Sequence, residues 1–265
     1  MSPRPRRRRS RSERRRASYL APKLITTASL LLGFWAITRA IHGEWKLGAW
    51  GIVLAGIFDM LDGRIARATR STSAFGIQYD SLADLISFGV APAVLYYTWA
   101  LEPMGRRGWA LAALFAVCTA LRLARFNVQT SEQKSNAYQG LPSTFAGGLA
   151  AVIVWFVADL GYTPPFGPGL GFVIASGFVL LALLMVSSVP YLSLSSLPLH
   201  GRHSFTTLVG IVLGIVALIL FQDPAFFVIG VTYILSGPVV WLYRLRHQTV
   251  ASQPNPIFGD SPDGR

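Results

Sequence analysis

The residues best suited to chemistry are four aspartates in an otherwise apolar stretch, Asp59, Asp62, Asp80 and Asp84. An acidic residue inside a membrane-spanning helix costs about 2.5–3.5 kcal/mol on insertion scales, so such residues are functional by default. Because the first pair is spaced by three residues and the second by four, each pair shares one face of a helix. The short linker between the pairs predicts an antiparallel hairpin in which all four carboxylates meet at the same depth.

Carboxylates that converge in a low-dielectric site cannot all stay ionised without compensating positive charge. Oxygen ligands of this kind select hard divalent cations such as Mg²⁺ or Mn²⁺. Two ions about 3.5–4 Å apart can be held between the pairs, an arrangement used for phosphoryl chemistry. A different interpretation is a buried ion-pair network in which Arg64, Arg67 and Arg70 neutralise the acids. We favour the metal site because ionisable residues in spanning helices are rarely structural.

Small residues alternate with these acids. Gly63 follows Asp62 directly, Ala66 lies one turn after Asp62, and Gly76 lies one turn before Asp80. Residues without bulk allow a backbone or a ligand to approach a helix closely. We therefore expect a flat, polar ligand to lie against this hairpin.

The surrounding sequence is that of a polytopic membrane protein. Of its 265 residues, 52% are hydrophobic and only 14% are charged, and the mean hydropathy is +0.46. A soluble domain carries about a quarter charged residues. This composition excludes a soluble enzyme, a disordered protein and a coiled coil. The single Cys118 also excludes a disulfide framework and a cysteine-based metal site.

The apolar segments predict the elements that position the acids. A spanning helix needs about 20 mostly apolar residues, so we expect an all-α helical bundle of about eight transmembrane helices. They cover residues 24–40, 47–68, 76–100, 109–126, 143–160, 169–187, 206–221 and 224–243. One membrane-embedded domain is expected over residues 20–245, between a disordered Arg-rich tail over 1–19 and a disordered tail over 246–265.

Basic residues set the expected orientation, because they accumulate on the cytoplasmic side of a membrane. With both termini in the cytoplasm, four basic residues of the 24 lie outside, which leaves 20 inside; the four are Arg39, Lys46, Arg106 and Arg107. The aspartate hairpin then opens to the cytoplasm, and the cell inner membrane is the expected location. The net charge of +12 comes largely from nine arginines near the N-terminus. We expect this charge to attract anionic lipid headgroups and not nucleic acid.

The aspartate hairpin matches a known sequence pattern. The run Asp-Met-Leu-Asp-Gly-Arg-Ile-Ala-Arg begins at Asp59, and after eight further residues Gly-Ile-Gln-Tyr-Asp-Ser-Leu-Ala-Asp begins at Gly76. Together the two runs resemble the complete signature of the CDP-alcohol phosphatidyltransferases, with all eight signature positions filled. Members of that family are integral membrane proteins that transfer a phosphatidyl group from a CDP-linked lipid to an alcohol and release CMP. The resemblance implies a helical bundle whose site opens to the cytoplasm.

The resemblance implies a role for each signature residue. Four aspartates would hold two divalent ions, Mg²⁺ or Mn²⁺: Asp59, Asp62, Asp80 and Asp84. Asp84 would also be the catalytic base that takes the proton from the acceptor hydroxyl. The residues that bind the CDP-linked lipid would be Asp59, Asp62, Gly63, Ala66, Arg67, Gly76 and Asp80. The family also implies a homodimer.

Further stretches are similar to the phosphatidylserine synthase branch of this family. They are Ser-Phe-Gly-Val-Ala-Pro-Ala from Ser87, Ala-Leu-Arg-Leu-Ala-Arg-Phe-Asn from Ala120, and Gly-Leu-Pro from Gly140. The similarity extends over about residues 20 to 200, and it implies CDP-diacylglycerol and L-serine as substrates. The same chemistry with glycerol 3-phosphate or an inositol phosphate as the acceptor stays open.

Three polar residues at the end of the fourth predicted helix can bind the acceptor or a lipid phosphate. Arg122 and Arg125 are candidates because a guanidinium group matches two carboxylate or phosphate oxygens at once, and Asn127 lies just beyond them. Both arginines fit equally well as topology anchors. The sequence departs from the branch at Lys23, where the pattern Pro-Asn-x-x-Thr has asparagine. We favour a snorkelling membrane anchor for this lysine.

Two other classes of protein also place acids in a membrane. A divalent-cation transporter needs them along a path through several helices, whereas these four gather in one place. A non-enzymatic lipid-binding scaffold would set four acids beside lipid phosphates, which is repulsive without metal ions. The sequence therefore favours an enzyme.

Overall fold

A computed structural model describes residues 11–69, 73–131 and 140–189, together with Gly230, Thr232, Ile234 and Gly237. Within these residues every regular element is a helix, and none is a strand. The predicted helix over 206–221 and the predicted tail over 246–265 lie outside the described residues. Of the predicted helix over 224–243, only the four named residues are described.

The helices follow one another along the chain with short connections. They are α1 (Arg11–Ile41), α2 (Trp45–Thr69), α3 (Ala74–Asp84), η1 (Leu85–Val90), α4 (Ala91–Tyr96), η2 (Tyr97–Leu101), η3 (Glu102–Met104), α5 (Arg106–Ser131), α6 (Ser143–Asp159) and α7 (Pro168–Val186). The elements from α3 to η3 form one continuous helical rod in which η1 and η2 are π-helical and η3 is a 3₁₀ turn. The six predicted helices that fall within the described residues all correspond to these elements.

The first helix is longer than the apolar segment that predicts it. It begins at Arg11, so residues 11–19, which the sequence pattern assigns to a disordered tail, are helical. Arginine, glutamate and alanine, which occur in this segment, are good helix formers, and the spanning segment that follows provides a helix to extend. Apolar patterning therefore locates the membrane part of this helix but not its N-terminal end.

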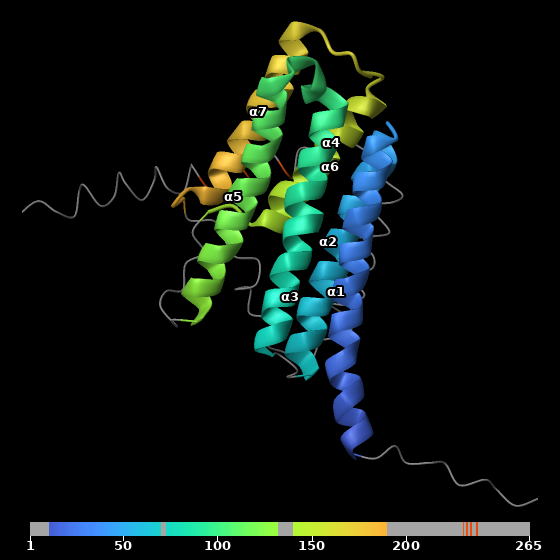
Figure 1. Cartoon of the computed structure of the whole chain (residues 1–265), viewed down its shortest axis with the longest axis vertical. Coiled ribbons are helices and arrows are strands. Elements are labelled where there is room, and N and C mark those ends of the chain that lie inside the picture. Colours follow the sequence, from blue (N-terminus) through green and yellow to red (C-terminus); the bar gives the residue numbers. More distant parts are fainter. Residues whose placement is uncertain are drawn as a thin grey trace, which may run out of the picture.

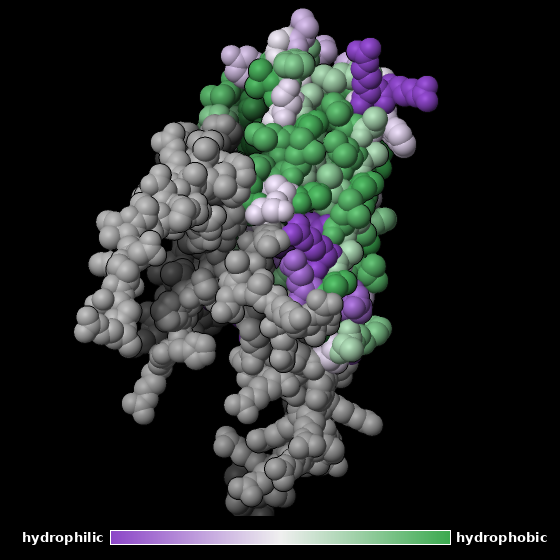
Figure 2. Space-filling model, turned by 90° about the vertical axis from the view of Figure 1, so that its left-hand side faces the viewer, coloured by the Kyte–Doolittle hydropathy of each residue, from purple (hydrophilic) through white to green (hydrophobic). Residues whose placement is uncertain are grey.

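Among the residues that the structure describes, four segments are long and apolar enough to cross a membrane, and they make this chain an integral membrane protein. They are Lys23–Ile41, Ala74–Met104, Arg106–Gln129 and Pro168–Val186. Large apolar side chains such as Leu31, Phe34 and Phe172 are exposed, and Figure 2 shows a broad hydrophobic area on one face with a compact hydrophilic patch below it. Soluble monomers rarely expose so large an apolar area, which here suits contact with lipid.

The rod from α3 to η3 lies at the centre of the bundle (Figure 1). The helices α1 and α2 form the most extensive helix pair, α5 contacts α7, and α6 lies against α2. Buried aromatic rings fill the space between the rod and the α5–α7 pair. The Tyr96 and Phe178 rings stack with centroids 4.0 Å apart, and Phe115 stacks on the other side of Phe178 at 4.3 Å.

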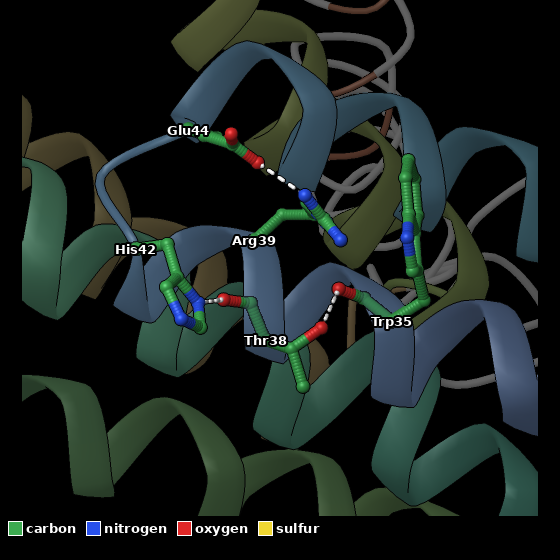
Figure 3. Close-up of polar contacts among 5 residues, drawn as sticks. All are labelled: Trp35, Thr38, Arg39, His42 and Glu44. Carbon is green, nitrogen blue, oxygen red and sulfur yellow. Dashed lines mark hydrogen bonds and ion pairs between the residues drawn. The ribbon is translucent and has the colours of Figure 1, made fainter.

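Polar contacts close the turn between α1 and α2 (Figure 3). Arg39 forms an ion pair with Glu44 at 2.7 Å, and the Nδ1 atom of His42 lies 2.6 Å from the Thr38 carbonyl oxygen. At the same end of the bundle, an ion pair of 2.6 Å joins Lys46 of α2 to Asp159 at the end of α6. This end is therefore fixed by exposed charge pairs, each of which contributes little stability alone.

The π-helical segment η1 brings the central rod close to its neighbours. Pro92 has no N–H, so the α-helical hydrogen bond to the carbonyl of Phe88, four residues earlier, is missing. The N–H of the preceding residue, Ala91, donates to the carbonyl oxygen of Ile86, five residues earlier, which is the π-helical pattern. Such wide turns interrupt α-helices at sites of local constraint. The backbone of Phe88 lies directly against Gly147 of α6.

The start of α6 is fastened to the end of α7. The N–H of Gly140 donates to the carbonyl oxygen of Val189 at 2.9 Å, and the N–H of Leu141 donates to that of Leu184 at 3.0 Å. Gly140 has a φ of 86°, and a Cβ atom there would collide with the carbonyl oxygen of Met185. Glycine is needed at this position for both reasons.

Adjacent glycines of α6 should respond oppositely to the same substitution. In Gly147→Ala the new methyl group would lie 2.8 Å from the Cα and carbonyl oxygen of Phe88, whereas a methyl group on Gly148 would meet no atom within 4 Å. Overpacking should cost Gly147→Ala about 1–3 kcal/mol. Gly148→Ala should keep or gain stability, since alanine favours helix by about 0.5–1 kcal/mol. Thermal unfolding in detergent measures the difference, and equal shifts for the two variants would contradict this packing.

Candidate metal centre

Three aspartates from two helices converge at the end of the bundle away from the α1–α2 turn. Asp59 and Asp62 come from α2 and Asp80 from α3, and each offers a carboxylate oxygen within 4.8 Å of the others. Asp62 is 4% exposed, and the other two are half-buried. The hairpin predicted from the spacing therefore does bring these carboxylates together.

The fourth aspartate stands slightly apart from these three. Asp84 is the last residue of α3, one turn beyond Asp80, and its carboxyl group interacts with that of Asp59. The wide turns of η1 begin at the next residue. Asp84 thus adjoins the cluster from the side of the central rod.

Two hydroxyl groups that the sequence pattern does not assign to the site donate to its carboxylates. Thr26 of α1 donates from Oγ1 to Oδ2 of Asp62 over 2.7 Å, and both side chains are buried. Thr144 of α6 donates to Oδ2 of Asp59 over 3.4 Å. Thr26 is the threonine of the Pro-Lys-x-x-Thr segment, so a sequence signal for it existed. Thr144 has no comparable signal.

Arg122 is directed toward the acids. Its Nη1 atom donates to Oγ of Ser143 at the start of α6 over 2.6 Å, and its charge lies close enough to attract both Asp59 and Asp84. Its guanidinium carbon also lies 5.7 Å from the Phe126 ring centroid. Arg122 therefore supplies positive charge at the edge of the cluster.

The other two candidates at the end of α5 make different contacts. The Nη1 atom of Arg125 donates to the carbonyl oxygen of Val186 at the end of α7 over 3.4 Å. The Nδ2 atom of Asn127 donates to Oγ of Ser81 on α3 over 2.9 Å. Of the three polar residues singled out in this segment, only Arg122 is brought to the aspartates.

The small residues of the hairpin lie beside the acids. Gly63 follows Asp62 within α2, and Gly76 lies in the first turn of α3, where its N–H donates to Oγ of the helix-capping Ser73. Among the described residues, a Cβ atom at Gly76 would approach only that oxygen, at 3.1 Å. The side chains of Ala66 and Arg67 lie outside the described part of the chain.

Lys23 takes part in a contact between α1 and α3. Its Nζ atom lies 4.7 Å from the centroid of the Phe75 ring, which stacks on Tyr79. The hydroxyl groups of Tyr79 and Thr27 are 2.9 Å apart. Lys23 therefore makes a cation–π contact that holds two helices together, a role beyond the membrane anchor expected from the sequence.

A cavity of about 990 Å³ lies at the opposite end of the bundle from the aspartates. It is lined mainly by apolar side chains of η2, α5 and α7, among them Trp99, Leu111 and Phe172. Large apolar pockets are the default candidates for ligand sites, but this one contains none of the four acids. The chemistry of the aspartate cluster therefore identifies the site better than cavity size does.

The donor set of the cluster fits a divalent metal ion. All three converging groups are carboxylates, and hard cations such as Mg²⁺ take oxygen ligands. Three negative charges at this separation repel one another strongly where water is scarce. A bound cation would offset this repulsion.

Comparison with known proteins places this site in a family. Residues 19–190 match the family model described as CDP-alcohol phosphatidyltransferase. The chain belongs to the CDP-alcohol phosphatidyltransferase family. The matched region contains all four aspartates of the hairpin and extends from within α1 to beyond the end of α7.

Several bacterial relatives of this chain share one name, CDP-diacylglycerol–serine O-phosphatidyltransferase. One from Helicobacter pylori is 41% identical over 65% of this chain and 72% of its own length. A second, from another strain of that species, is 36% identical over 86% of this chain and 93% of its own length. One from Mycobacterium tuberculosis is 28% identical over 93% of this chain and 85% of its own length.

Charge repulsion in the cluster predicts an unusual stability change. Asp80→Asn removes one of three close negative charges, so this variant should unfold at a higher temperature than the wild type in excess chelator. A relief of about 1 kcal/mol corresponds to about 2–4 °C for a chain of this size. With a divalent cation present, the order should reverse, because binding to the folded state stabilises the wild type more.

Asp159→Asn is the matched control for this experiment. It removes a carboxylate that forms an ion pair with Lys46 far from the cluster, so it should change the melting temperature little under either condition. A fall in the melting temperature of Asp80→Asn in chelator would show that the cluster is held together by other forces.

Proposed function

We propose that this protein is a phosphatidylserine synthase that transfers the phosphatidyl group of CDP-diacylglycerol to the hydroxyl group of L-serine and releases CMP. The observation that carries the proposal is the convergence of Asp59, Asp62 and Asp80 within 4.8 Å in a chain of this family. The relatives named above share serine as the acceptor in their names. This supports serine over glycerol 3-phosphate or an inositol phosphate.

In this proposal the three converging aspartates are ligands of Mg²⁺ or Mn²⁺, and two ions are held in the complete site. When bound there, divalent ions would neutralise the negative charge that develops as CMP leaves. Thr26 and Thr144 hold two of the carboxylates from outside the cluster. Gly63, Ala66, Arg67 and Gly76 border the position of the cytidine and its phosphates, where small residues permit close approach.

Asp84 is the proposed general base. It accepts the proton of the serine hydroxyl while the hydroxyl oxygen forms a bond to the phosphorus on the lipid side, and the bond from that phosphorus to CMP breaks. Its position beside Asp59, one turn beyond Asp80, supports this division of roles. A base must lie within hydrogen-bonding reach of the proton that it takes. Asp84 can satisfy this condition, and its carboxylate would also be available to hold a second ion.

Arg122 is the proposed partner of the serine carboxylate. Its guanidinium group adjoins Asp84, so a serine whose hydroxyl contacts this aspartate has its carboxylate near a matching cation. Arg125 contacts the end of α7, and Asn127 contacts Ser81 on α3. We therefore assign them to the lipid phosphate or to the membrane surface.

The proposed membrane arrangement has eight spans with both termini and the aspartate site in the cytoplasm, in the cell inner membrane. The charge distribution supports it, because Arg39 and Lys46 lie at the end of the bundle away from the acids. We also propose a single membrane domain over residues 20–245 and a homodimer, as the family resemblance implies.

A direct assay of the acceptor tests the function. The purified full-length protein in detergent should release CMP from CDP-diacylglycerol only when serine is added, and not with glycerol 3-phosphate or inositol phosphate. Excess EDTA should abolish release, and Mg²⁺ or Mn²⁺ but not Zn²⁺ alone should restore it, because all-oxygen sites prefer hard ions.

Each other outcome of this assay has a definite meaning. Release with a different alcohol would keep the chemistry and change the acceptor. Full activity in EDTA would remove the metal ions from the mechanism. No release with any acceptor, together with Mn²⁺ uptake by proteoliposomes, would identify a cation transporter.

Two substitutions should separate the roles of the aspartates. Asp59→Asn removes a charged ligand, so its turnover should recover in part at high metal concentration. Asp84→Asn removes the base, which should lower turnover by about 10²–10⁴-fold and should not respond to added metal. Serine turnover against metal concentration, with CDP-diacylglycerol affinity measured in parallel, gives the comparison. Equal rescue of both variants would make Asp84 a ligand and place the base elsewhere.

A further inference from the structure

We infer that Thr26 is a positioning residue that sets the affinity of the metal centre by fixing the carboxylate of Asp62. The inference rests on the metal centre of the proposed function, and it adds a residue of α1 to a site otherwise formed by α2 and α3. Nothing in the signature of the hairpin includes α1.

The bond between these two side chains is short and buried. The Oγ1 atom of Thr26 donates to Oδ2 of Asp62 over 2.7 Å, and the two residues are 7% and 4% exposed. Hydrogen bonds to an ionised acceptor are shorter and stronger than neutral ones. Because the bond is buried, the hydroxyl group restricts the rotation of the carboxylate and so fixes the direction in which its oxygens point.

Other threonines in these helices use their hydroxyl groups differently. Thr27, Thr98 and Thr119 each donate to the carbonyl oxygen four residues earlier in their own helix, a common local arrangement. Thr26 donates across to another helix and to a member of the aspartate cluster. Its hydroxyl group therefore serves the cluster.

The pairing of α1 with α2 holds the donor at the required depth. One turn along α1, Oγ of Ser29 donates to the carbonyl oxygen of Ala55 on α2 over 3.0 Å. Farther along, a Cβ atom on Gly51 of α2 would lie 2.9 Å from that of Ala36, which shows how closely the backbones approach. Such rigid support is what allows a partner outside the ligand set to orient a ligand, and loss of such partners lowers metal affinity about 10–100-fold.

The test measures metal binding directly in the full-length protein in detergent, with Mn²⁺ as the probe. Free Mn²⁺ is followed by electron paramagnetic resonance during a titration without substrate. Thr26→Val keeps the shape of the side chain but removes the donor, so its dissociation constant for Mn²⁺ should rise about 10–100-fold. Thr26→Ser keeps the donor and should bind nearly as the wild type does.

Thr38→Val is the matched control. Thr38 lies on the same helix, and its hydroxyl group donates to the carbonyl oxygen of Trp35 near the opposite end, so its loss should leave Mn²⁺ affinity unchanged. Melting in chelator checks that each variant is folded. If Thr26→Val unfolds early there, Thr26→Ala takes its place with the same expectation.

Three outcomes would overturn the inference: wild-type affinity in the variant without the donor, equal weakening in Thr38→Val, or failure of Thr26→Ser to restore binding. The titration also separates this inference from the proposed function. A wild-type protein that binds Mn²⁺ with the expected dependence on Thr26 but releases no CMP would refute the function alone. A protein that releases CMP with metal affinity independent of Thr26 would refute the inference alone.

Discussion

Repulsion between carboxylates is the constraint on which the arrangement of this bundle depends. Asp59, Asp62 and Asp80 approach within 4.8 Å in a region with little water, where like charges interact strongly. Folding alone therefore has to hold together groups that would separate if the helices were free. The α1–α2 pair, the central rod and the start of α6 all contact the cluster or its supports. These contacts oppose the separation of the carboxylates.

The scaffold achieves this rigidity by close contact between backbones. Glycine on α6 lets that helix touch the wide turn of η1 at Phe88, and hydroxyl groups of Ser29 and Ser87 connect α1 to the helices on either side. Small residues and hydroxyl bonds are the usual means of helix association in lipid, where burial of apolar surface gives no advantage. The same contacts leave Asp84 at the junction between a regular helix and a π-helical segment.

Much of this arrangement could be predicted from the sequence because it depends on local spacing. Intervals of three and four residues place Asp59 with Asp62 and Asp80 with Asp84 on single helix faces, and apolar length locates most helix ends to within a few residues. Contacts between distant segments could not be predicted in this way. The bonds from Thr26 to Asp62 and from Thr144 to Asp59 depend on which faces of three helices meet. The direction of Arg122 and that of Arg125 likewise follow from the positions of α6 and α7.

Backbone hydrogen bonds attach Gly140 and Leu141 to the end of α7. They make the position of α6 independent of the chain segment that precedes Gly140. Backbone hydrogen bonds fix the register of α6 from this point, so Ser143 and Thr144 keep their positions beside Arg122 and Asp59 whatever chain length precedes Gly140. Changes in chain length before Gly140 should therefore leave the aspartate cluster undisturbed. A fusion partner or an epitope is best inserted before this glycine, since one residue added inside α6 would rotate the part of the helix that follows by about 100°.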